Sequence, residues 1–305
     1  MPDGKLSGIL NINKPKGMTS HDVVARVRKI TRQRKVGHAG TLDPMATGVL
    51  LLCLGPATRV AEYLMASDKI YCARIRLGIA TDTYDAEGEI VSQVETDGVT
   101  RAQVERELSG LVGSLKQVPP MYSAIKYKGT PLYRLARRGQ TVARQPRKVE
   151  IRALKLLEWA PPELEIEVHC SKGTYIRSLA HDLGQRLGCG AHVVSLTRIA
   201  SGHFRIEQAV SLEDLEQAFA EGRATALLQP LDAALQAFPA ITVDQATAIR
   251  ITFGQQVRLP KAPEVRMCRA YAVDGRLLAL LRYHADGLWQ PHKVFAQPTN
   301  HENHP

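Results

Sequence analysis

The sequence predicts an α+β protein with a large N-terminal domain and a small β-rich C-terminal domain. Segments that alternate apolar and polar residues, as strands do, are interspersed with segments whose apolar residues recur at helical spacing. A length of 305 residues is typical of roughly two domains. The pair Asp274-Gly275, between two apolar runs, indicates a β-hairpin near the C-terminus.

The composition is that of a globular protein with a polyanionic partner. Hydrophobic residues make up 44% of the chain and charged residues 23%, and the formal net charge is +10. No stretch has the ~18 consecutive apolar residues of a membrane helix, and the N-terminus lacks the apolar core of a signal peptide. Five scattered cysteines without a CxxC pair indicate free thiols, so we expect a cytoplasmic protein with no membrane association.

The chain begins with a strand, a turn and an amphipathic helix. Residues 8–13 alternate like a strand and run into a turn at residues 14–17. Thr19 or Ser20 can cap the following helix, whose apolar residues lie three or four positions apart. These apolar residues are Val23, Val24, Val27 and Ile30.

Residues 37–48 form the loop around which the rest of the chain is organised. The loop holds three glycines, His38, Asp43 and Pro44, and a buried-type apolar run follows at once. Glycine lets the backbone approach a ligand closely, and Pro44 biases Asp43 away from helical geometry. An ordinary loop before a buried strand would have the same composition, so the loop alone does not establish a site.

A short helix and a strand follow this loop. Val60, Tyr63 and Leu64 mark the helix, and residues 69–77 read as the strand. Tyr71 shares a face with the apolar residues of that strand, so it is either a core tyrosine or a polar tip in a site.

The next segments complete the N-terminal domain. We expect a helix at residues 101–113, an extended segment with two prolines at 118–124, a strand at 164–170, a helix from about Ile176 and a strand at 193–199. The acidic turn at residues 81–88 resembles a calcium loop. Because Tyr84 and Ala86 occupy positions that need oxygen ligands, we expect no metal site there.

Residues 126–148 carry eight basic residues and no acidic residue. Solvated surfaces normally mix the two signs, and this run is interleaved with Tyr127 and Tyr133. Lys and Arg neutralise phosphates and tyrosines stack on bases, so we expect nucleic-acid contact here. The basic residues are Lys126, Lys128, Arg134, Arg137, Arg138, Arg144, Arg147 and Lys148.

The domain boundary is expected near residue 238. Residues 1–238 would form the first domain, with the basic insertion at about residues 120–148. Residues 239–296 would form the second, with a helix at 244–253 and the hairpin described above. We expect residues 297–305 to be a disordered tail.

Five short motifs together resemble the bacterial tRNA pseudouridine synthases of the TruB type. They follow the family's order and span most of the first 200 residues. The motifs are Asn-Lys-Pro-Lys-Gly-Met-Thr-Ser at residues 13–20, Gly-His-Ala-Gly-Thr-Leu-Asp-Pro at 37–44, Lys-Ile-Tyr at 69–71, Gln-Val-Pro-Pro-Met-Tyr-Ser-Ala at 117–124 and Gly-Thr-Tyr-Ile-Arg at 173–177. One departure is Thr197, where many members have Arg; it removes a possible phosphate contact and leaves Leu196 in place.

The resemblance implies a catalytic domain built on a mixed, mainly antiparallel sheet, followed by a PUA-like RNA-binding domain. It also implies the isomerisation of uridine 55, in the T loop of tRNA, to its C-glycoside. Breaking an N-glycosidic bond and rejoining the base through carbon needs a carboxylate beside the sugar, which would be Asp43 as nucleophile. Arg177 would keep that carboxylate ionised, and Tyr71 would stack on the base near the proton that moves.

The target nucleotide must leave the folded T loop to be reached. The resemblance implies that His38 supports the opened loop and that Tyr175 and Leu196 line the pocket. The further residues expected to bind RNA are Lys14, Lys126, Arg137, Arg138 and Arg147. The reaction has no redox change or net hydrolysis, so we expect no cofactor or metal.

Two other readings compete with this one. A non-catalytic RNA-binding protein would explain the basic segment, but it has no need of Asp43, Tyr71 and Arg177 together. The guide-RNA-dependent branch of the same enzymes works inside a multi-protein particle, and nothing here resembles a docking extension. We therefore expect a monomer that acts on tRNA without a guide RNA. Whether Asp43 attacks the sugar or the base stays open.

Overall fold

The computed structural model describes residues 6–259 and 264–296, which form two compact units. One unit consists mainly of residues 10–228 and the other mainly of residues 229–296. None of the helices in this described part of the chain combines the length and hydrophobicity that crossing a bilayer requires. The tail predicted at residues 297–305 lies outside the described residues.

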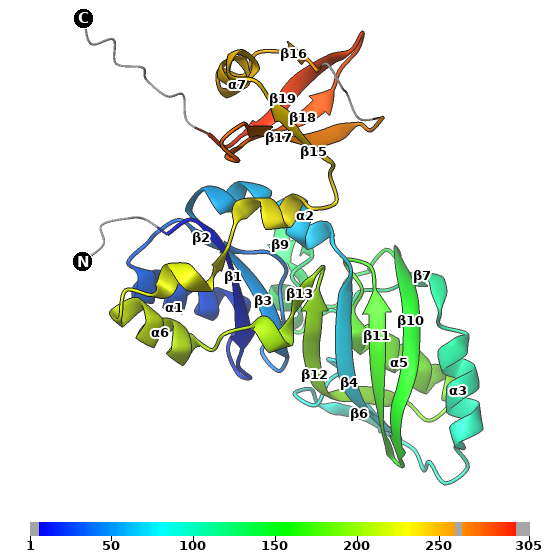
Figure 1. Ribbon diagram of the computed structural model, residues 1–305. Helices are drawn as coiled ribbons and strands as arrows, with labels where there is room; N and C mark the ends of the chain where they lie inside the picture. The colour runs from blue at the N-terminus through cyan, green and yellow to red at the C-terminus, as the bar shows by residue number, and fades with distance from the viewer. Residues whose placement is uncertain (1–5, 260–263, 297–305) are drawn as a thin grey trace, which may run out of the picture. The chain divides into compact units, whose positions relative to one another are not determined.

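A ten-stranded sheet forms the frame of the larger unit (Figure 1). Its main path runs β14-β1-β3-β12-β4-β11-β10-β7, with β2 paired to β3 and β13 paired to β12. The strands are β1 (Gly8–Lys14), β2 (Val36–His38), β3 (Thr47–Leu54), β4 (Lys69–Leu77), β7 (Gly113–Gln117), β10 (Arg147–Ala160), β11 (Glu163–Cys170), β12 (Ala191–Ser201), β13 (Phe204–Arg205) and β14 (Leu228–Gln229). The β3–β12 pair is parallel, whereas β12–β4, β4–β11, β11–β10 and β10–β7 are antiparallel, so the predicted mixed, mainly antiparallel sheet is confirmed.

Helices pack against this sheet. Helix α5 (Ile176–Leu187) contacts β12 and β4, and helix α3 (Arg101–Ser109) contacts α5 and β10, so the two helices lie side by side against neighbouring parts of the sheet. Helix α1 packs with α6 beside β2. The helices of this unit are α1 (Ser20–Thr31), α2 (Ala61–Ala66), α3 (Arg101–Ser109), α4 (Leu132–Ala136), α5 (Ile176–Leu187) and α6 (Leu212–Ala220), with 3₁₀ turns η1 (Gly55–Val60), η2 (Ile206–Gln208) and η3 (Ala224–Leu227).

Local sequence signals explain where several helices begin. Thr19 is the N-cap of α1, and its hydroxyl and the Asp22 carboxylate form a capping box, which stabilises a helix by about 1 kcal/mol. Ser211 and Asp214 form the same arrangement at α6. Helix α3 ends at Ser109 rather than at residue 113, because the chain turns there to enter β7.

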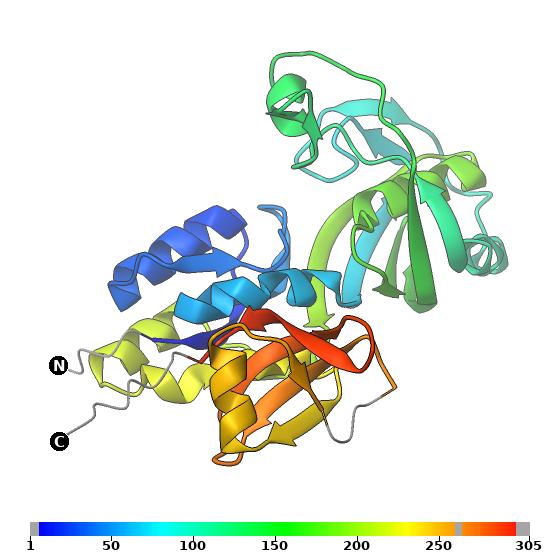
Figure 2. The same cartoon turned by 90° about the horizontal axis from the view of Figure 1, so that it is seen from above.

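Two small hairpins project from the large sheet. One pairs β5 (Ile79–Thr81) with β6 (Ile90–Gln93), and the other pairs β8 (Lys126–Tyr127) with β9 (Thr130–Pro131). The segment between β7 and β10 contains the second hairpin and α4, and Figure 2 shows it extending away from the sheet. It corresponds to the basic insertion expected from the sequence.

The second unit is β-rich, as predicted. Its five-stranded sheet runs β15-β17-β18-β19-β16 around a core that includes the fully buried Trp289. Its elements are η4 (Leu231–Leu235), β15 (Ala240–Val243), α7 (Gln245–Thr252), β16 (Val257–Arg258), β17 (Met267–Ala272), β18 (Leu277–Tyr283) and β19 (Leu288–Val294). Asp274-Gly275 connects β17 and β18 as the predicted hairpin turn. The likeness of this unit to a PUA domain stays a prediction.

The second unit starts at residue 229, ahead of the boundary expected near residue 238. Hydrogen bonds explain this position. The Tyr271 hydroxyl donates to the Asp232 carboxylate at 2.6 Å, and the Arg269 guanidinium donates to the Phe238 carbonyl at 2.8 Å. The segment before residue 239 is therefore fastened to the β-rich sheet.

Candidate active site

The loop between β2 and β3 presents Asp43, and hydrogen bonds to the loop's backbone amides and carbonyls hold it in place. The Ala39 amide donates to the Leu51 carbonyl at 2.8 Å. The Ser20 hydroxyl, at the start of α1, accepts from the Leu42 amide at 2.8 Å and donates to the Leu42 carbonyl at 3.1 Å. These contacts hold the residue before Asp43, so the carboxylate projects from a rigid backbone.

Lys14 supports this loop from beneath. Its side chain is fully buried, and its Nζ donates to the carbonyls of Met18 at 2.6 Å, Pro15 at 2.8 Å and Pro44 at 3.3 Å. Burial lowers the pKa of Lys14 to about 8, although the nearby Asp43 carboxylate opposes that shift. Lys14 was predicted to bind RNA, but its ammonium group instead contacts backbone carbonyls inside the protein.

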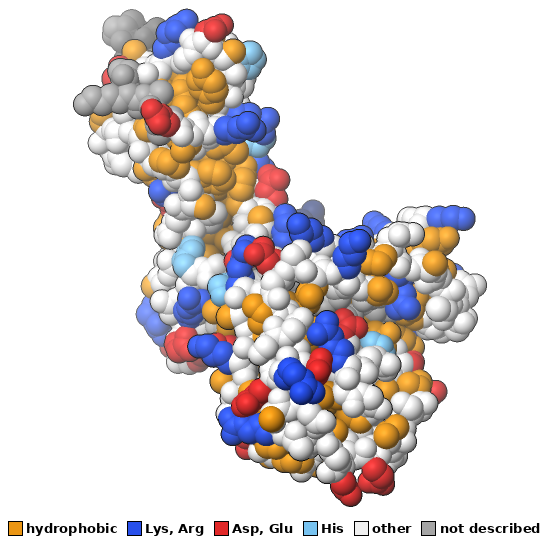
Figure 3. Space-filling view, turned by 90° about the vertical axis from the view of Figure 1, so that its right-hand side faces the viewer, with side chains coloured by type: hydrophobic (Ala, Val, Ile, Leu, Met, Phe, Trp, Pro, Cys, Tyr) orange, Lys and Arg blue, Asp and Glu red, His pale blue; other side chains and the backbone are white. Residues whose placement is uncertain are grey.

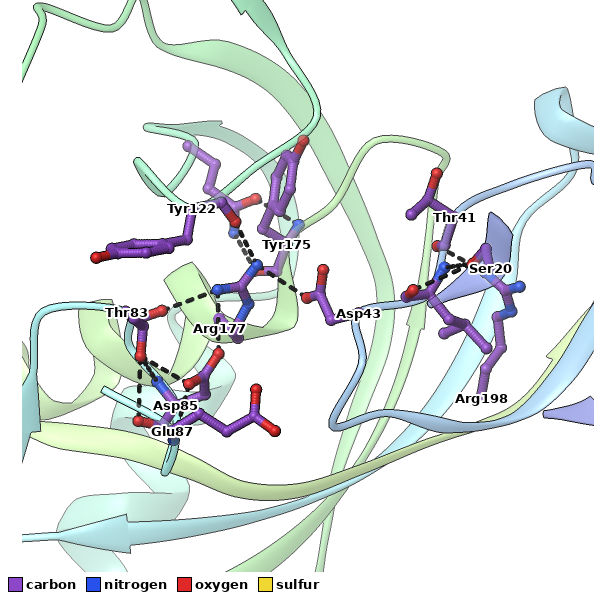
Figure 4. Close-up of polar contacts among 12 residues, drawn as sticks. Ser20, Thr41, Asp43, Thr83, Asp85, Glu87, Tyr122, Tyr175, Arg177 and Arg198 are labelled. Atoms are coloured by element: carbon purple, nitrogen blue, oxygen red, sulfur yellow. Dashed lines mark hydrogen bonds and ion pairs between the residues drawn. The ribbon is translucent and has the colours of Figure 1, made fainter. Parts of the chain in front are cut away.

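Arg177 joins two carboxylates at the centre of the site (Figure 4). Its Nη2 lies 2.9 Å from an oxygen of Asp43, and its Nη1 lies 3.1 Å from an oxygen of Asp85. The side chain of Arg177 is 4% exposed and that of Asp85 6%, whereas that of Asp43 is 33% exposed. The predicted Asp43–Arg177 pair is thus brought together, with Asp43 on the accessible side.

Asp85 is the main feature of the site that the sequence did not identify. Its carboxylate accepts from the Thr83 hydroxyl at 2.6 Å and from the Glu87 amide at 3.1 Å, as well as from Arg177. By sequence, the acidic turn that contains Asp85 resembles a calcium loop that lacks oxygen ligands, and this resemblance does not indicate a partner for Arg177. A signal was nevertheless present, because a buried guanidinium has five N–H donors and one carboxylate cannot satisfy them all.

Two backbone carbonyls complete the surroundings of Arg177. The Thr83 carbonyl accepts from Nη1 at 3.0 Å and the Tyr122 carbonyl from Nη2 at 2.7 Å. Tyr84 adopts a left-handed backbone conformation, with φ of 64°, and its ring stacks on His181 of α5 at 4.0 Å. This stack fastens the acidic turn to the helix that carries Arg177.

The electrostatics of Asp43 reflect two opposing effects. Burial raises the pKa of its carboxyl above the ordinary 3.8, and the negative charge of Asp85 adds to that rise. The guanidinium of Arg177, and to a lesser degree the ammonium of Lys14, opposes it. The two cations therefore favour an ionised carboxylate in a place that would otherwise hold its proton.

Tyr71 lies on β4 among buried residues, as its position in the strand predicts. Burial raises the pKa of its phenol, so the hydroxyl stays protonated near neutral pH and can donate a hydrogen bond. Leu196, on the neighbouring strand β12, is 6% exposed and lies across from Ala73. These positions are compatible with an apolar wall for a planar base.

Tyr175 connects the site with the root of the basic insertion. It is the N-cap residue of α5, and its amide and carbonyl form hydrogen bonds of 2.8 and 3.0 Å with the Gln117 side chain. The Ser178 hydroxyl donates to the Val118 carbonyl at 2.9 Å. The start of α5, which carries Arg177, is thus bonded to the residues from which the insertion leaves the sheet.

His38 lies at the end of β2, with its ring edge-to-face to that of His21 at 5.0 Å. Burial lowers the pKa of His38, and the neighbouring His21 and Arg198 lower it further. The imidazole is therefore neutral at pH 7. A neutral ring can stack on a base without the cost of removing a charge from water.

The four basic residues predicted to bind RNA in the insertion, Lys126, Arg137, Arg138 and Arg147, are all exposed. Within residues 6–259 and 264–296 none of the four forms an ion pair, and Arg137 lies over the ring of Tyr133. On the face of the larger unit seen in Figure 3, by contrast, Lys and Arg side chains are interspersed with Asp and Glu. The insertion therefore carries unneutralised positive charge.

The arrangement combines an accessible carboxylate, a buried arginine bound to it, a protonated tyrosine and an exposed basic segment. Such a site can act on a polyanion through a nucleophilic carboxylate. No group of three or more His, Cys, Asp or Glu side chains suited to a metal ion occurs among the described residues.

Comparisons with known proteins agree with this geometry. Residues 28–176 match the N-terminal domain model of the TruB family pseudouridylate synthases, and residues 177–236 match a C-terminal domain model of tRNA pseudouridylate synthase B. The tRNA pseudouridine synthase B of Dehalococcoides mccartyi is 45% identical over 298 residues, 98% of this chain and 99% of the relative. That of Stutzerimonas stutzeri is 45% identical over 292 residues, 95% of each chain. A Cbf5 structure from a Cbf5–Nop10–Gar1 complex superposes with a TM-score of 0.75 at 26% identity, covering 98% of this chain and 91% of that one.

Proposed function

Because the chain belongs to the TruB family of pseudouridine synthases, we propose that it isomerises uridine 55 in the T loop of tRNA to pseudouridine, without a guide RNA and with Asp43 as nucleophile. The observation that carries the proposal is the accessible Asp43 carboxylate bonded to the buried Arg177 at 2.9 Å. Relatives about 45% identical over nearly the whole chain are named as acting on tRNA. The Cbf5 structure is more distant, at 26% identity.

The proposed chemistry moves the base from one bond to another. The bond between N1 of the base and C1′ of the ribose breaks while Asp43 forms a covalent bond to the nucleotide. The freed base turns, and C5 joins C1′ as the bond to Asp43 is released. The proton leaves C5 and N1 gains one, so atoms and electrons balance without a co-reactant. Whether Asp43 attacks the sugar or the base stays open, because both routes would use the same residues.

The surrounding side chains have separate tasks in this proposal. Arg177 keeps Asp43 ionised and oriented, and Asp85 holds Arg177 from its other side. Tyr71 stacks on the turned base, and its protonated hydroxyl can relay the C5 proton by passing its own proton to solvent as it takes up the one that leaves C5. His38 fills the gap left by the flipped nucleotide, and the basic insertion binds the tRNA backbone.

The test uses the purified protein with no other component. A tRNA transcript is incubated with the protein and mapped with carbodiimide for pseudouridine. We expect modification at position 55 alone, and none with a transcript that carries cytidine there. Asp43→Asn keeps the shape and removes the charge, so it should bind tRNA and form no pseudouridine. Modification only in the presence of an added RNA, or turnover by Asp43→Asn, would contradict the proposal.

A further inference from the structure

Arg198 is a cation buried in the middle of the large sheet. Its residue is 1% exposed, and no carboxylate among the described residues lies within ion-pair distance of it. Burying a guanidinium costs several kcal/mol unless its donors are satisfied, and apolar residues of similar volume commonly stabilise such positions as well or better. The presence of Arg198 therefore calls for a reason other than filling the core.

The donors of Arg198 all reach the Asp43 loop and the strand that follows it. Its Nε donates to the Val49 carbonyl at 2.6 Å, its Nη2 to the Gly40 carbonyl at 3.2 Å and its Nη1 to the Thr41 carbonyl at 3.4 Å. Figure 4 shows the guanidinium beside Thr41, at the opposite end of the loop from Arg177. One side chain thus binds both sides of the turn that presents Asp43.

The backbone of Arg198 lies between the two strands that carry the site. Strand β12 pairs with β3 on one side and with β4 on the other, and Arg198 lies across from Gly48 and from Tyr71. A Cβ at Gly48 would lie 2.3 Å from the Arg198 carbonyl oxygen, and Gly48 has a φ of 96°. Only glycine fits there, so the backbones of β3 and β12 approach each other closely at this point.

A second observation connects the guanidinium of Arg198 with the phenol of Tyr71. Arg198 lies directly across from Tyr71 on the neighbouring strand, and its positive charge opposes the rise that burial causes in the Tyr71 pKa. The residue that holds the Gly40 and Thr41 carbonyls is therefore also the cross-strand neighbour of the second proposed functional group.

We propose that Arg198 is a positioning residue that fixes the Asp43 loop relative to Tyr71. The inference rests on the proposed function and extends it. Arg198 does not touch the substrate, and it acts through the three carbonyls that it binds and through its position across from Tyr71. A loop released from Arg198 would still display Asp43, but the distance between its carboxylate and the ring stacked on Tyr71 would vary.

The inference predicts a loss in the chemical step with little loss in binding. A displacement of about 1 Å in a reacting group can cost ~10²-fold in rate. Arg198→Met keeps the length and apolar volume and removes every donor. Arg198→Lys keeps the charge but can reach fewer carbonyls, so its rate should lie between those of Arg198→Met and the wild type. Arg205→Gln is the matched control, because Arg205 is an exposed arginine on β13 whose side chain donates to the Gly202 carbonyl of its own turn.

The experiment measures single-turnover pseudouridine formation in tRNA and the Kd for tRNA separately. We expect Arg198→Met to react about 10²-fold more slowly and Arg198→Lys about 10-fold more slowly, with Kd within twofold of wild type. If Arg198→Met does not fold, Arg198→Lys decides the question. A wild type that makes no pseudouridine at position 55 would refute the proposed function. An active wild type whose folded Arg198 variants react within threefold of it would refute this inference alone.

A double-mutant cycle separates positioning from general support of the fold. If Arg198 acts by positioning Asp43 relative to Tyr71, the effects of Arg198→Lys and Tyr71→Phe on the rate are coupled. The rate of the double variant should then fall by a smaller factor than the product of the two single-variant factors. A double variant whose rate falls by the full product of the two factors would overturn the role assigned to Arg198. A loss that arises wholly in the Kd for tRNA would overturn it as well.

Discussion

The Asp85–Arg177 ion pair allows a sharp test of how the site is held together. In Asp85→Asn, the amide oxygen can still accept from the Thr83 hydroxyl and the Glu87 amide, as the present Oδ1 does at 2.6 and 3.1 Å. The amide nitrogen then faces Nη1 of Arg177, which lies 3.1 Å from Oδ2 in the native site. Two donors would meet where a donor and an acceptor meet now.

The size of the effect follows from the contacts that remain. Arg177 keeps Asp43 at 2.9 Å and the carbonyls of Thr83 and Tyr122 at 3.0 and 2.7 Å, so each of its two terminal nitrogens still has an acceptor. What is lost is one hydrogen bond between charged groups, which contributes about 1.5–3 kcal/mol. If that bond orients Arg177 and thereby the reacting carboxylate, its free energy appears in the activation barrier. At ~1.36 kcal/mol per factor of ten, the rate should then fall about 10- to 150-fold.

The assay is single-turnover pseudouridine formation at saturating enzyme, with Kd for tRNA and the unfolding temperature measured alongside. Glu87→Gln is the control, because Glu87 lies exposed in the same turn and its side chain does not contact Arg177 in the described structure. We expect the control to match the wild type and Asp85→Asn to lose rate but not affinity. A folded Asp85→Asn within threefold of the wild-type rate would refute the argument that Asp85 acts through Arg177.

Three further predictions concern Tyr71, the basic insertion and Asp43. Tyr71→Phe should lose about 10²-fold in turnover, the range of general acid–base catalysis, with an unchanged Kd for tRNA. A fully active Phe variant would mean that Tyr71 has only a packing role. Tyr71→Ala should in addition lower the free energy of unfolding, measured with denaturant, by roughly 3–5 kcal/mol. Arg137→Glu combined with Arg138→Glu should weaken binding to all tRNAs alike and flatten its salt dependence, and an unchanged salt slope would contradict phosphate binding. Asp43 has a raised pKa in the folded protein, so its ionisation costs stability that is regained as the pH falls through that pKa. Asp43→Asn should therefore unfold at pH 7 at no lower temperature than wild type, and a clear drop in calorimetry would show that its pairing with Arg177 outweighs desolvation.

The features that the sequence predicted well depend on residues close together in the chain. The Thr19 cap, the buried face of β4 and the hairpin at Asp274 each arise from interactions within a few positions. Helix α3 was predicted four residues too long, because Leu111 continues the apolar spacing although the chain has already turned. Periodicity reports which side chains are buried, and a buried residue just beyond a helix satisfies it equally well.

The parts of the site that could not be predicted depend on contacts across long separations. Asp85 and Arg177 are 92 positions apart, and Arg198 is 149 positions from Val49. Their association requires the order β3-β12-β4 in the sheet, which no local pattern contains. The resemblance identified the motif that holds Lys14, but only the packing of that motif against Pro44 reveals that its ammonium group points inward.

These inward-pointing cations change how the net charge of +10 should be interpreted. Lys14, Lys69, Arg177 and Arg198 are all buried, and each donates to backbone carbonyls, to carboxylates or to both. Three of them, Lys14, Arg177 and Arg198, converge on the loop that carries Asp43. Because these three side chains are buried and hold the loop that presents the Asp43 carboxylate, their positive charge adds little to the binding of phosphates at the surface. Exposed cations are therefore the part of the net charge that a polyanion can contact, and the insertion at residues 126–148 has eight cationic residues with no acidic one to neutralise them. The basic isoelectric point of this chain thus has two structural parts, the buried cations around the Asp43 loop and the exposed cations of the insertion that we propose binds tRNA.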